Sequence, residues 1–271
     1  MKPKIISSAG NTFLPDLRRL YAYRALIYVF AQRDLKVQYS QTFMGIMWSL
    51  LQPLTGLLIF SFFFSYVVKV DTGGIPYPLF AFSGMISWYF FSALMAQSGT
   101  SLMQSQYLIR KIYFPKLVLP VSKALSCFAE FGISLALLFV IMLISGYLPQ
   151  LSLLFLPVFI FLNLLTGLTV GLWLSALTIR YRDFHHIIPY LLNFGIWLTP
   201  VFYPVTLLPE KIKFLIYFNP MAGVIAGFRW SLLGGEAPSV HYAYAFGLIV
   251  LLFFGGLYYF RRMETKIADL V

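Results

Sequence analysis

Few residues in this sequence are of the types that carry out catalysis. No glycine is followed directly by a lysine among the 271 residues, which excludes a Walker-type phosphate-binding loop. The zinc-binding pattern His-Glu-x-x-His is also absent, and the adjacent His185 and His186 are interpreted as interfacial residues beside a basic helix end. Cys127, the single cysteine, is interpreted as a small buried hydrophobe. These features predict a chain that is not an enzyme and binds no metal or cofactor itself.

One acidic side chain lies where an ion or substrate site is found in transporters. Glu130 is the sole charged candidate inside an apolar segment, two helical turns beyond Lys123 and roughly 10 Å deeper by helix rise. It has two possible roles: coupling or substrate binding, or a structural role in which it is neutralised or bonded to a neighbouring helix. A single acid without a chain of ionisable partners argues against a proton pump.

The elements that must position these residues are membrane-spanning helices. Hydrophobic residues make up 60% of the chain and charged residues only 11%, a composition that predicts an all-α integral membrane protein. Uncharged runs separated by turn residues predict six transmembrane helices in one domain covering residues 37–271. With no cleavable leader in the first twelve residues, the first of these helices is expected to act as the targeting signal. The predicted spans are about 43–68, 79–103, 125–144, 153–178, 186–203 and 242–260.

The basic residues indicate how these helices are oriented. With the amino terminus placed inside, 16 of the 20 lysines and arginines fall in cytoplasmic segments, which predicts that both termini are cytoplasmic. The same residues lie between apolar runs rather than on a polar domain, so the formal charge of +11 does not favour a nucleic-acid partner.

Residues 1–36 are predicted to form a cytoplasmic interfacial segment. Apolar residues recur at three- and four-residue spacing between residues 13 and 36, which is typical of an amphipathic helix lying on the membrane. Arg18 and Arg19 lie off this stripe, whereas Arg24 falls on it and would have to snorkel. The alternative is a soluble turn without membrane contact.

A second unusual segment covers residues 197–229. Its prolines forbid one continuous helix, yet the segment is largely apolar, and non-helical backbone at membrane depth is tolerated only where protein buries it or water reaches it. We therefore predict short re-entrant helices on the outer side, with an exposed loop as the alternative. The candidate gate residues are Pro200, Phe202, Tyr203, Pro204 and Pro209.

Aromatic and small residues add two weaker signals. Trp88, Tyr89, Phe90 and Phe91 either anchor their helix at the headgroup level or line a path on which sugar rings stack. Two Gly-x-x-x-Gly pairs, Gly167 with Gly171 and Gly223 with Gly227, permit close helix approach, and packing within the chain is the favoured interpretation.

Several short motifs occur in an order that resembles a known family, the membrane-spanning permease subunits of bacterial ABC transporters that export polysaccharides such as O antigen, capsule and teichoic acid. The resemblance covers nearly the whole chain, although Gln38 and the pair Phe43-Met44 depart from the family pattern and bear on the substrate subtype. The matching residues are Arg33-Asp34-Leu35-Lys36, Tyr39, Gly45, Trp48, Pro53, Arg180-Tyr181-Arg182-Asp183-Phe184, Pro200-Val201-Phe202-Tyr203-Pro204, Asn219-Pro220 and Arg229.

The resemblance implies partners and sites. It implies a homodimer in the bacterial cytoplasmic membrane, with a central channel and two copies of a separate ATPase that holds ATP and Mg. The segment 106–116 resembles the element that docks onto the ATPase, with plain positive-inside charge as the alternative; its implied coupling residues are Gln106, Arg110, Lys111, Tyr113, Pro115 and Lys116. The residues implied to meet a phosphate or pyrophosphate of a lipid-linked glycan are Arg18, Arg19, Arg24, Arg33 and Lys36.

The predicted function is accordingly that of the permease half of an ATP-driven exporter of lipid-linked polysaccharide. An ABC permease for a drug or small lipid would share the topology. An ion-coupled secondary transporter is expected to contain midplane ionisable residues and internal repeats, of which only Glu130 is found. A structural scaffold is a third alternative, which the proline-broken outer segment makes less attractive.

Overall fold

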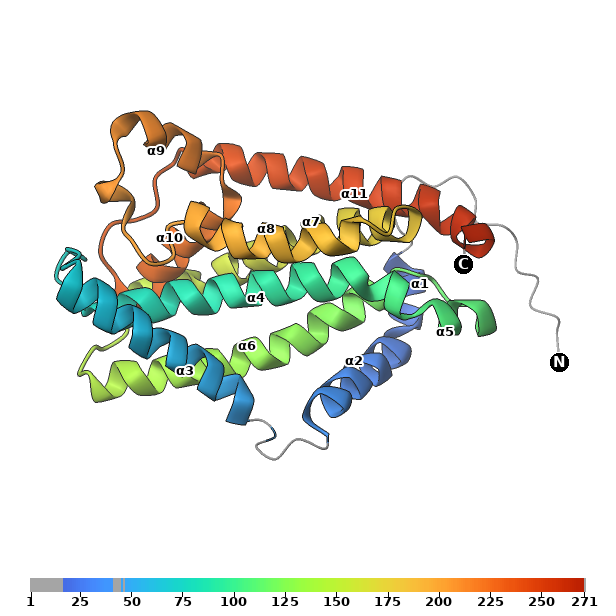
Figure 1. Ribbon diagram of the computed structural model, residues 1–271, viewed down its shortest axis with the longest axis horizontal. Coiled ribbons are helices and arrows are strands. Elements are labelled where there is room, and N and C mark those ends of the chain that lie inside the picture. The colour runs from blue at the N-terminus through green and yellow to red at the C-terminus, as the bar shows by residue number, and fades with distance from the viewer. Residues whose placement is uncertain (1–16, 41–44, 46, 271) are drawn as a thin grey trace.

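The computed structural model describes residues 17–40, 45 and 47–270, and these residues are almost entirely helical (Figure 1). The elements within the described ranges are α1 (Leu17–Ala22), α2 (Arg24–Tyr39), α3 (Met47–Ser61), the π-helix η1 (Phe62–Val67), α4 (Tyr77–Gln104), α5 (Gln106–Lys111), α6 (Val118–Ile144), the 3-10 helix η2 (Leu151–Phe155), α7 (Leu156–Arg180), α8 (Phe184–Leu198), the 3-10 helix η3 (Val205–Leu207), α9 (Glu210–Tyr217), α10 (Pro220–Leu233) and α11 (Tyr242–Leu270).

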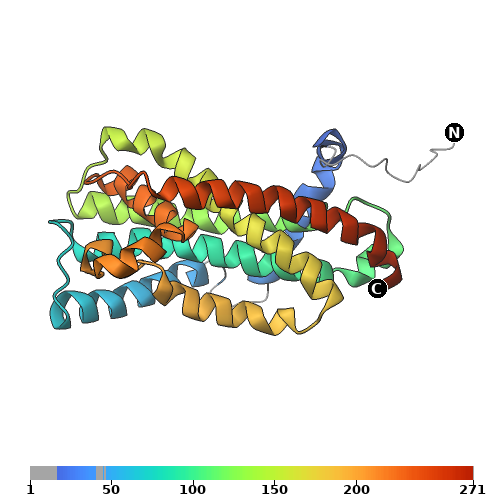
Figure 2. The same cartoon turned by 90° about the horizontal axis from the view of Figure 1, so that it is seen from above.

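The long helices lie side by side as a bundle whose two ends are distinct (Figures 1 and 2). At one end, which we call the α10 end, lie α9, α10 and the turns after η1 and α6. At the other, the α5 end, lie α5, the turn between α7 and α8, and the last turns of α11. This alternation of turns between the two ends is the one expected for a multi-pass membrane protein.

Five of the six predicted spans correspond to helices that are long and apolar enough to cross a membrane. The exception is the span predicted over 186–203, because α8 ends at Leu198 and at 15 residues is about 22 Å long. Thr199 adopts an extended backbone (φ −107°, ψ 138°), as a residue before a proline does, and the helix cannot continue through Pro200. The segment predicted as the fifth span is therefore a short helix followed by irregular backbone.

The interfacial segment also differs from its prediction. Instead of one helix over 13–36, the described part contains α1 and α2 with a break at Tyr23, and α2 continues to Tyr39, so the predicted boundary after residue 36 falls inside a helix. Phe30 and Ala31 are buried, and the Phe30 ring meets that of Phe114 edge-on at 5.8 Å. α2 thus packs against the bundle. The apolar pattern of the sequence alone did not predict where this helix begins and ends.

Helices α4 and α7 form the centre of the bundle, and small or hydroxyl-bearing residues bring them together. A Cβ atom on Gly167 would lie 2.8 Å from Leu94, and one on Gly171 would lie 2.7 Å from Ser98. Hydrogen bonds cross the interface from Asn163 Nδ2 to the Ser87 carbonyl (2.9 Å). Such close backbone approach and interhelical hydrogen bonding replace the hydrophobic effect as the cohesive force inside a membrane.

The second glycine pair packs α10 against other helices of the same chain. A Cβ on Gly223 would lie 2.9 Å from Tyr242, and one on Gly227 would lie 1.8 Å from the ring of Phe159. The interpretation that both glycine pairs serve packing within the chain is confirmed.

Gly227→Ala is therefore expected to destabilise the protein by about 1–3 kcal/mol, because its methyl group overlaps Phe159. Thermal unfolding in detergent measures the change. Gly132→Ala is the matched control, since a Cβ there meets nothing within 4 Å and alanine favours the helix. Equal melting temperatures for the two variants would contradict the close contact between α7 and α10.

Candidate functional site

The predicted gate residues lie at the α10 end, and most of them pack into one irregular segment between α8 and η3. Pro200 and Phe202 are buried, and the Phe202 ring stacks on that of Phe60 in α3 at 3.8 Å. Tyr203 and Pro204 are partly buried, whereas Pro209 is exposed ahead of α9. The structure therefore brings four of the five predicted gate residues together. We call residues 199–204 the gate segment.

Polar side chains from other helices hold the backbone of the gate segment. The Tyr77 hydroxyl donates to the Phe202 carbonyl (2.9 Å), and Asn219 Nδ2 donates to Thr199 Oγ1 (2.9 Å). Arg229 of α10 donates to the carbonyls of Pro200 (2.8 Å) and Val201. Its contacts were not foreseen from the sequence, although a lone basic residue in the apolar run of α10 is the kind of signal that marks a functional or buried partner.

Three of the four predicted channel aromatics lie in the protein interior. Trp88, Phe90 and Phe91 are buried within the core, and Tyr89 alone is partly exposed. Phe90 packs on Phe131 with ring centroids 4.6 Å apart. These rings pack in the interior rather than line an open path, because other helices cover α4 on most of its surface.

Several exposed rings lie on α3, η1 and α8, which lie along the same side of the bundle (Figure 2), and others are spread over α6, α7, α9 and α11. α3 and α8 meet where the Phe60 ring contacts the Trp197 ring, with ring centroids 6.1 Å apart. Only 11% of the most apolar window of α3–η1 is buried, against 78% for α4. We call this side the α3/α8 face; its exposed aromatic residues include Phe62, Phe63, Tyr66, Tyr190, Phe194 and Trp197.

The predicted docking residues lie at the α5 end, where α5 projects beyond the bundle (Figure 1). Arg110, Lys111 and Tyr113 are exposed, whereas Gln106 and Pro115 are partly buried. The ammonium of Lys111 lies 4.1 Å from the Tyr107 ring centroid.

Lys116 differs from the other predicted docking residues because its side chain is buried, at 9% exposure. Its ammonium lies 4.9 Å from the Phe114 ring centroid, and burial lowers the pKa of this lysine, although Glu264 opposes the shift. Its backbone amide donates to Glu264 Oε1 of α11 (2.7 Å). Lys116 thus helps to fix the loop that carries α5 and does not belong to its outer surface.

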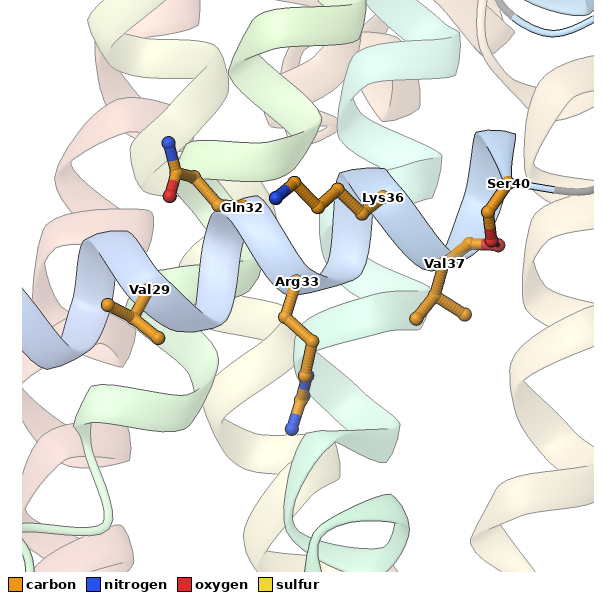
Figure 3. A pocket seen from close by; sticks show the side chains of 6 residues that line it. All are labelled: Val29, Gln32, Arg33, Lys36, Val37 and Ser40. Atoms are coloured by element: carbon orange, nitrogen blue, oxygen red, sulfur yellow. Dashed lines mark hydrogen bonds between the residues drawn. The ribbon is translucent and has the colours of Figure 1, made fainter.

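The predicted headgroup residues are only partly assembled. The side chains of Arg18 and Arg19 lie outside the described residues, while those of Arg24, Arg33 and Lys36 are exposed. The last two border an open groove of about 310 Å³ along α2, with Val29, Gln32, Val37 and Ser40 (Figure 3). Figure 3 shows Arg33 and Lys36 leaving α2 in different directions, so they form a basic rim and not a convergent pair.

Two polar contacts join α2 to α6. Asp34 lies between Arg33 Nη2 (2.9 Å) and Lys123 Nζ (2.9 Å). The Tyr39 hydroxyl donates to Glu130 Oε1 (3.1 Å) and contacts Ser49 Oγ at 2.8 Å, and burial raises the pKa of Tyr39, which keeps this donor protonated. Glu130 therefore has a bonded partner on a neighbouring helix, as the structural alternative for this residue expects.

The fold and these sites define a multi-pass membrane transport subunit: a helical bundle with a projecting element at one end and a broken crossing at the other. The sequence matches the family model of the ABC-2 type transporter over residues 25–233, well over half of its length. The chain therefore belongs to the ABC-2 type transporter family.

Curated relatives match along most of their own length. The chain is 29% identical over 216 residues to the O-antigen export system permease protein RfbA of Myxococcus xanthus, covering 79% of this chain and 82% of that protein. It is 27% identical to the RfbA protein of Klebsiella pneumoniae, covering 91% and 95%. It is 21% identical to the polysialic acid transport protein KpsM of Escherichia coli, covering 88% and 93%.

The ion pair between Asp34 and Lys123 is expected to couple α2 energetically to α6. Asp34→Asn and Lys123→Gln should each lower the melting temperature, and the double variant should lose less than the sum, with a coupling of about 0.5–3 kcal/mol. Asp34→Asn combined with Lys213→Gln of the distant α9 is the control and should be additive. Strict additivity in the first cycle would show that the pair does not hold the two helices together.

Proposed function

We propose that this chain is the permease subunit of an ATP-driven exporter that moves a lipid-linked polysaccharide across the bacterial cytoplasmic membrane. The observation that carries the proposal is the similarity to permeases named for O-antigen and polysialic acid transport, which extends over 79–91% of this chain. A short shared motif would not produce a match of that extent.

The energy for transport is proposed to come from a separate ATPase that binds ATP and Mg. The chain contains no Walker-type phosphate loop of its own. Helix α5 supports a docking role because it projects from the bundle with Arg110, Lys111 and Tyr113 exposed. Two copies of the permease and two of the ATPase would form the transporter.

The α3/α8 face is proposed to meet a second copy of the chain and to border the translocation path. It is less covered than the rest of the bundle, and its exposed rings offer apolar faces on which the C–H faces of sugars can slide. These rings take over the role predicted for Trp88, Phe90 and Phe91, which are buried in the core.

The groove along α2 is proposed to receive the phosphate-bearing headgroup of the lipid carrier. Arg33 and Lys36 place two cations at its rim, and Val29 and Val37 provide apolar surface for the adjoining acyl or prenyl carbons. Arg24 lies one turn or more before this groove on the same helix and remains exposed. Cations of this kind bind phosphate oxygens through charge-assisted hydrogen bonds.

The test of the proposed function is deletion of the encoding gene followed by complementation. Loss of surface polysaccharide, restored by this chain, together with co-purification of an ATPase, is the expected result. Unchanged surface glycan with altered drug or lipid efflux would favour a permease for a small substrate. Transport that persists without any ATPase would contradict the proposal and favour an ion-coupled transporter.

The docking surface has its own test. Arg110→Ala with Lys111→Ala should reduce the ATPase recovered on the affinity-tagged chain several-fold while leaving its level in the membrane unchanged. Lys211→Ala with Lys213→Ala removes the same charge at the α10 end and should leave recovery intact. Equal recovery in both variants would show that α5 is not where the ATPase docks.

The aromatic face provides a further prediction. Trp197→Ala with Tyr190→Ala should lower polysaccharide export several-fold without loss of ATPase association, because both rings lie on the proposed path. Phe155→Ala with Phe161→Ala removes two exposed rings outside the α3/α8 face, on η2 and α7, and should leave export close to the parent level. The reverse ranking would place the path elsewhere.

A further inference from the structure

Arg229 makes a contact that neither its position in α10 nor the proposed function explains. Its Nη1 donates to the Pro200 carbonyl (2.8 Å), its Nη2 to the Val201 carbonyl, and its Nε to the Phe80 carbonyl in the first turn of α4 (3.2 Å). The guanidinium lies 3.6 Å from the centroid of the Phe80 ring. One side chain thus joins three elements: α10, α4 and the gate segment.

Two of the three acceptors that Arg229 uses are carbonyls of irregular backbone. Pro200 and Val201 follow the end of α8, so no further helical turn donates to them, and Val201 is fully buried. A buried carbonyl without a donor costs about 1–3 kcal/mol. Arginine suits the position because its planar fork presents several donors in one rigid geometry, which lysine cannot match.

The charge is balanced without an acid among the described contacts of the guanidinium. Three carbonyl dipoles and the face of Phe80 surround it. Hydrogen bonds from a flexible side chain to a backbone that lacks regular structure can be broken and remade without unfolding a helix.

Glycine at position 84 makes room for this arrangement. A Cβ there would lie 2.5 Å from Arg229 Nη2 and 2.8 Å from the Val201 carbonyl oxygen. The absence of a side chain lets the guanidinium and the gate segment reach the surface of α4 together. The geometry is thus built from three segments distant in the sequence.

The gate segment connects this contact to the proposed path. Phe202, next to the held carbonyls, stacks on Phe60, and Phe60 also contacts Trp197 of the α3/α8 face. Movement of residues 200–202 would therefore move rings at the edge of that face.

We propose that Arg229 is a positioning residue that latches the gate segment against α4, and that export requires this latch to release. The proposal rests on the proposed function, because it assigns a closed state to the outer end of the translocation path. Arg229 itself touches no substrate; it acts through the backbone of Pro200 and Val201.

The experiment uses cysteine accessibility in the full-length chain. Cys127, the single cysteine, is buried and is first replaced in Cys127→Ala, after which Val201→Cys introduces a reporter where the native side chain is fully buried. A membrane-impermeant maleimide added outside cells measures opening. Val240→Cys, at a position 86% exposed, serves as the reporter control and should label equally in all variants.

With Arg229 intact, labelling at position 201 should be low at rest and rise several-fold during ATP-driven export. Arg229→Gln should label several-fold more already at rest, and Arg229→Lys should lie between the two. Tyr77→Phe removes one neutral hydrogen bond to the same segment and should change resting labelling far less. If the Val201→Cys chain fails to insert into the membrane, Tyr203→Cys serves as the reporter instead. If the Arg229→Gln chain fails to insert, Arg229→Lys alone is compared with the parent.

Two results would overturn the latch. One is equal resting labelling at position 201 with and without the guanidinium. The other is export by the parent chain with no rise in labelling at position 201. The resting measurement needs neither ATPase nor glycan. A chain that exports no polysaccharide would therefore contradict the proposed function while leaving the resting comparison informative.

Discussion

The guanidinium of Arg229 donates hydrogen bonds to backbone carbonyls just beyond α8, the helix that ends short of the length of its predicted span. Inside a bilayer every exposed carbonyl needs a donor from protein, so α8 can end at Leu198 only if another element supplies one. Arg229 supplies donors to two carbonyls after the helix end and at the same time to Phe80 of α4. Next to these carbonyls the Phe202 ring stacks on Phe60 of α3, and the Tyr77 hydroxyl donates to the Phe202 carbonyl, so several contacts hold this segment together.

The rest of the bundle is arranged around a rigid centre and a less covered side. α4 and α7 approach closely through Gly167 and Gly171, and hydrogen bonds such as Thr178 Oγ1 to the Gly99 carbonyl (2.7 Å) cross between them. α3 and α8 lie outside this pair, and they are the two helices with a proline inside, Pro53 and Pro189. A proline removes an intrahelical hydrogen bond and allows bending. The helices with such a proline, α3 and α8, are also those of the α3/α8 face.

The sequence predicted the spanning segments well because lipid imposes a length and an apolar composition on each of them, as Tyr77–Gln104 and Val118–Ile144 illustrate. The glycine pairs were equally readable, since only a missing side chain permits such contacts. The rotation of each helix about its axis could not be predicted, because an apolar residue such as Phe90 is compatible with lipid, with the protein core and with a channel wall. The contact of Lys116 with Glu264 and that of Arg229 with Phe80 were also hidden, as each joins residues more than a hundred positions apart in the chain.

The α5 end and the α10 end are joined by one uninterrupted element. α4 is 28 residues long, about 42 Å, and its one proline lies in the first turn, where it breaks no hydrogen bond. Its last residue leads through Ser105 into α5, and its first turn provides the Phe80 carbonyl that Arg229 holds. The loop after α5 is tied in turn to α11 through Glu264. α4 therefore runs without a break from α5 to the contacts with the gate segment, while α3 and α8 beside it each have a hydrogen bond of the helix removed by an interior proline.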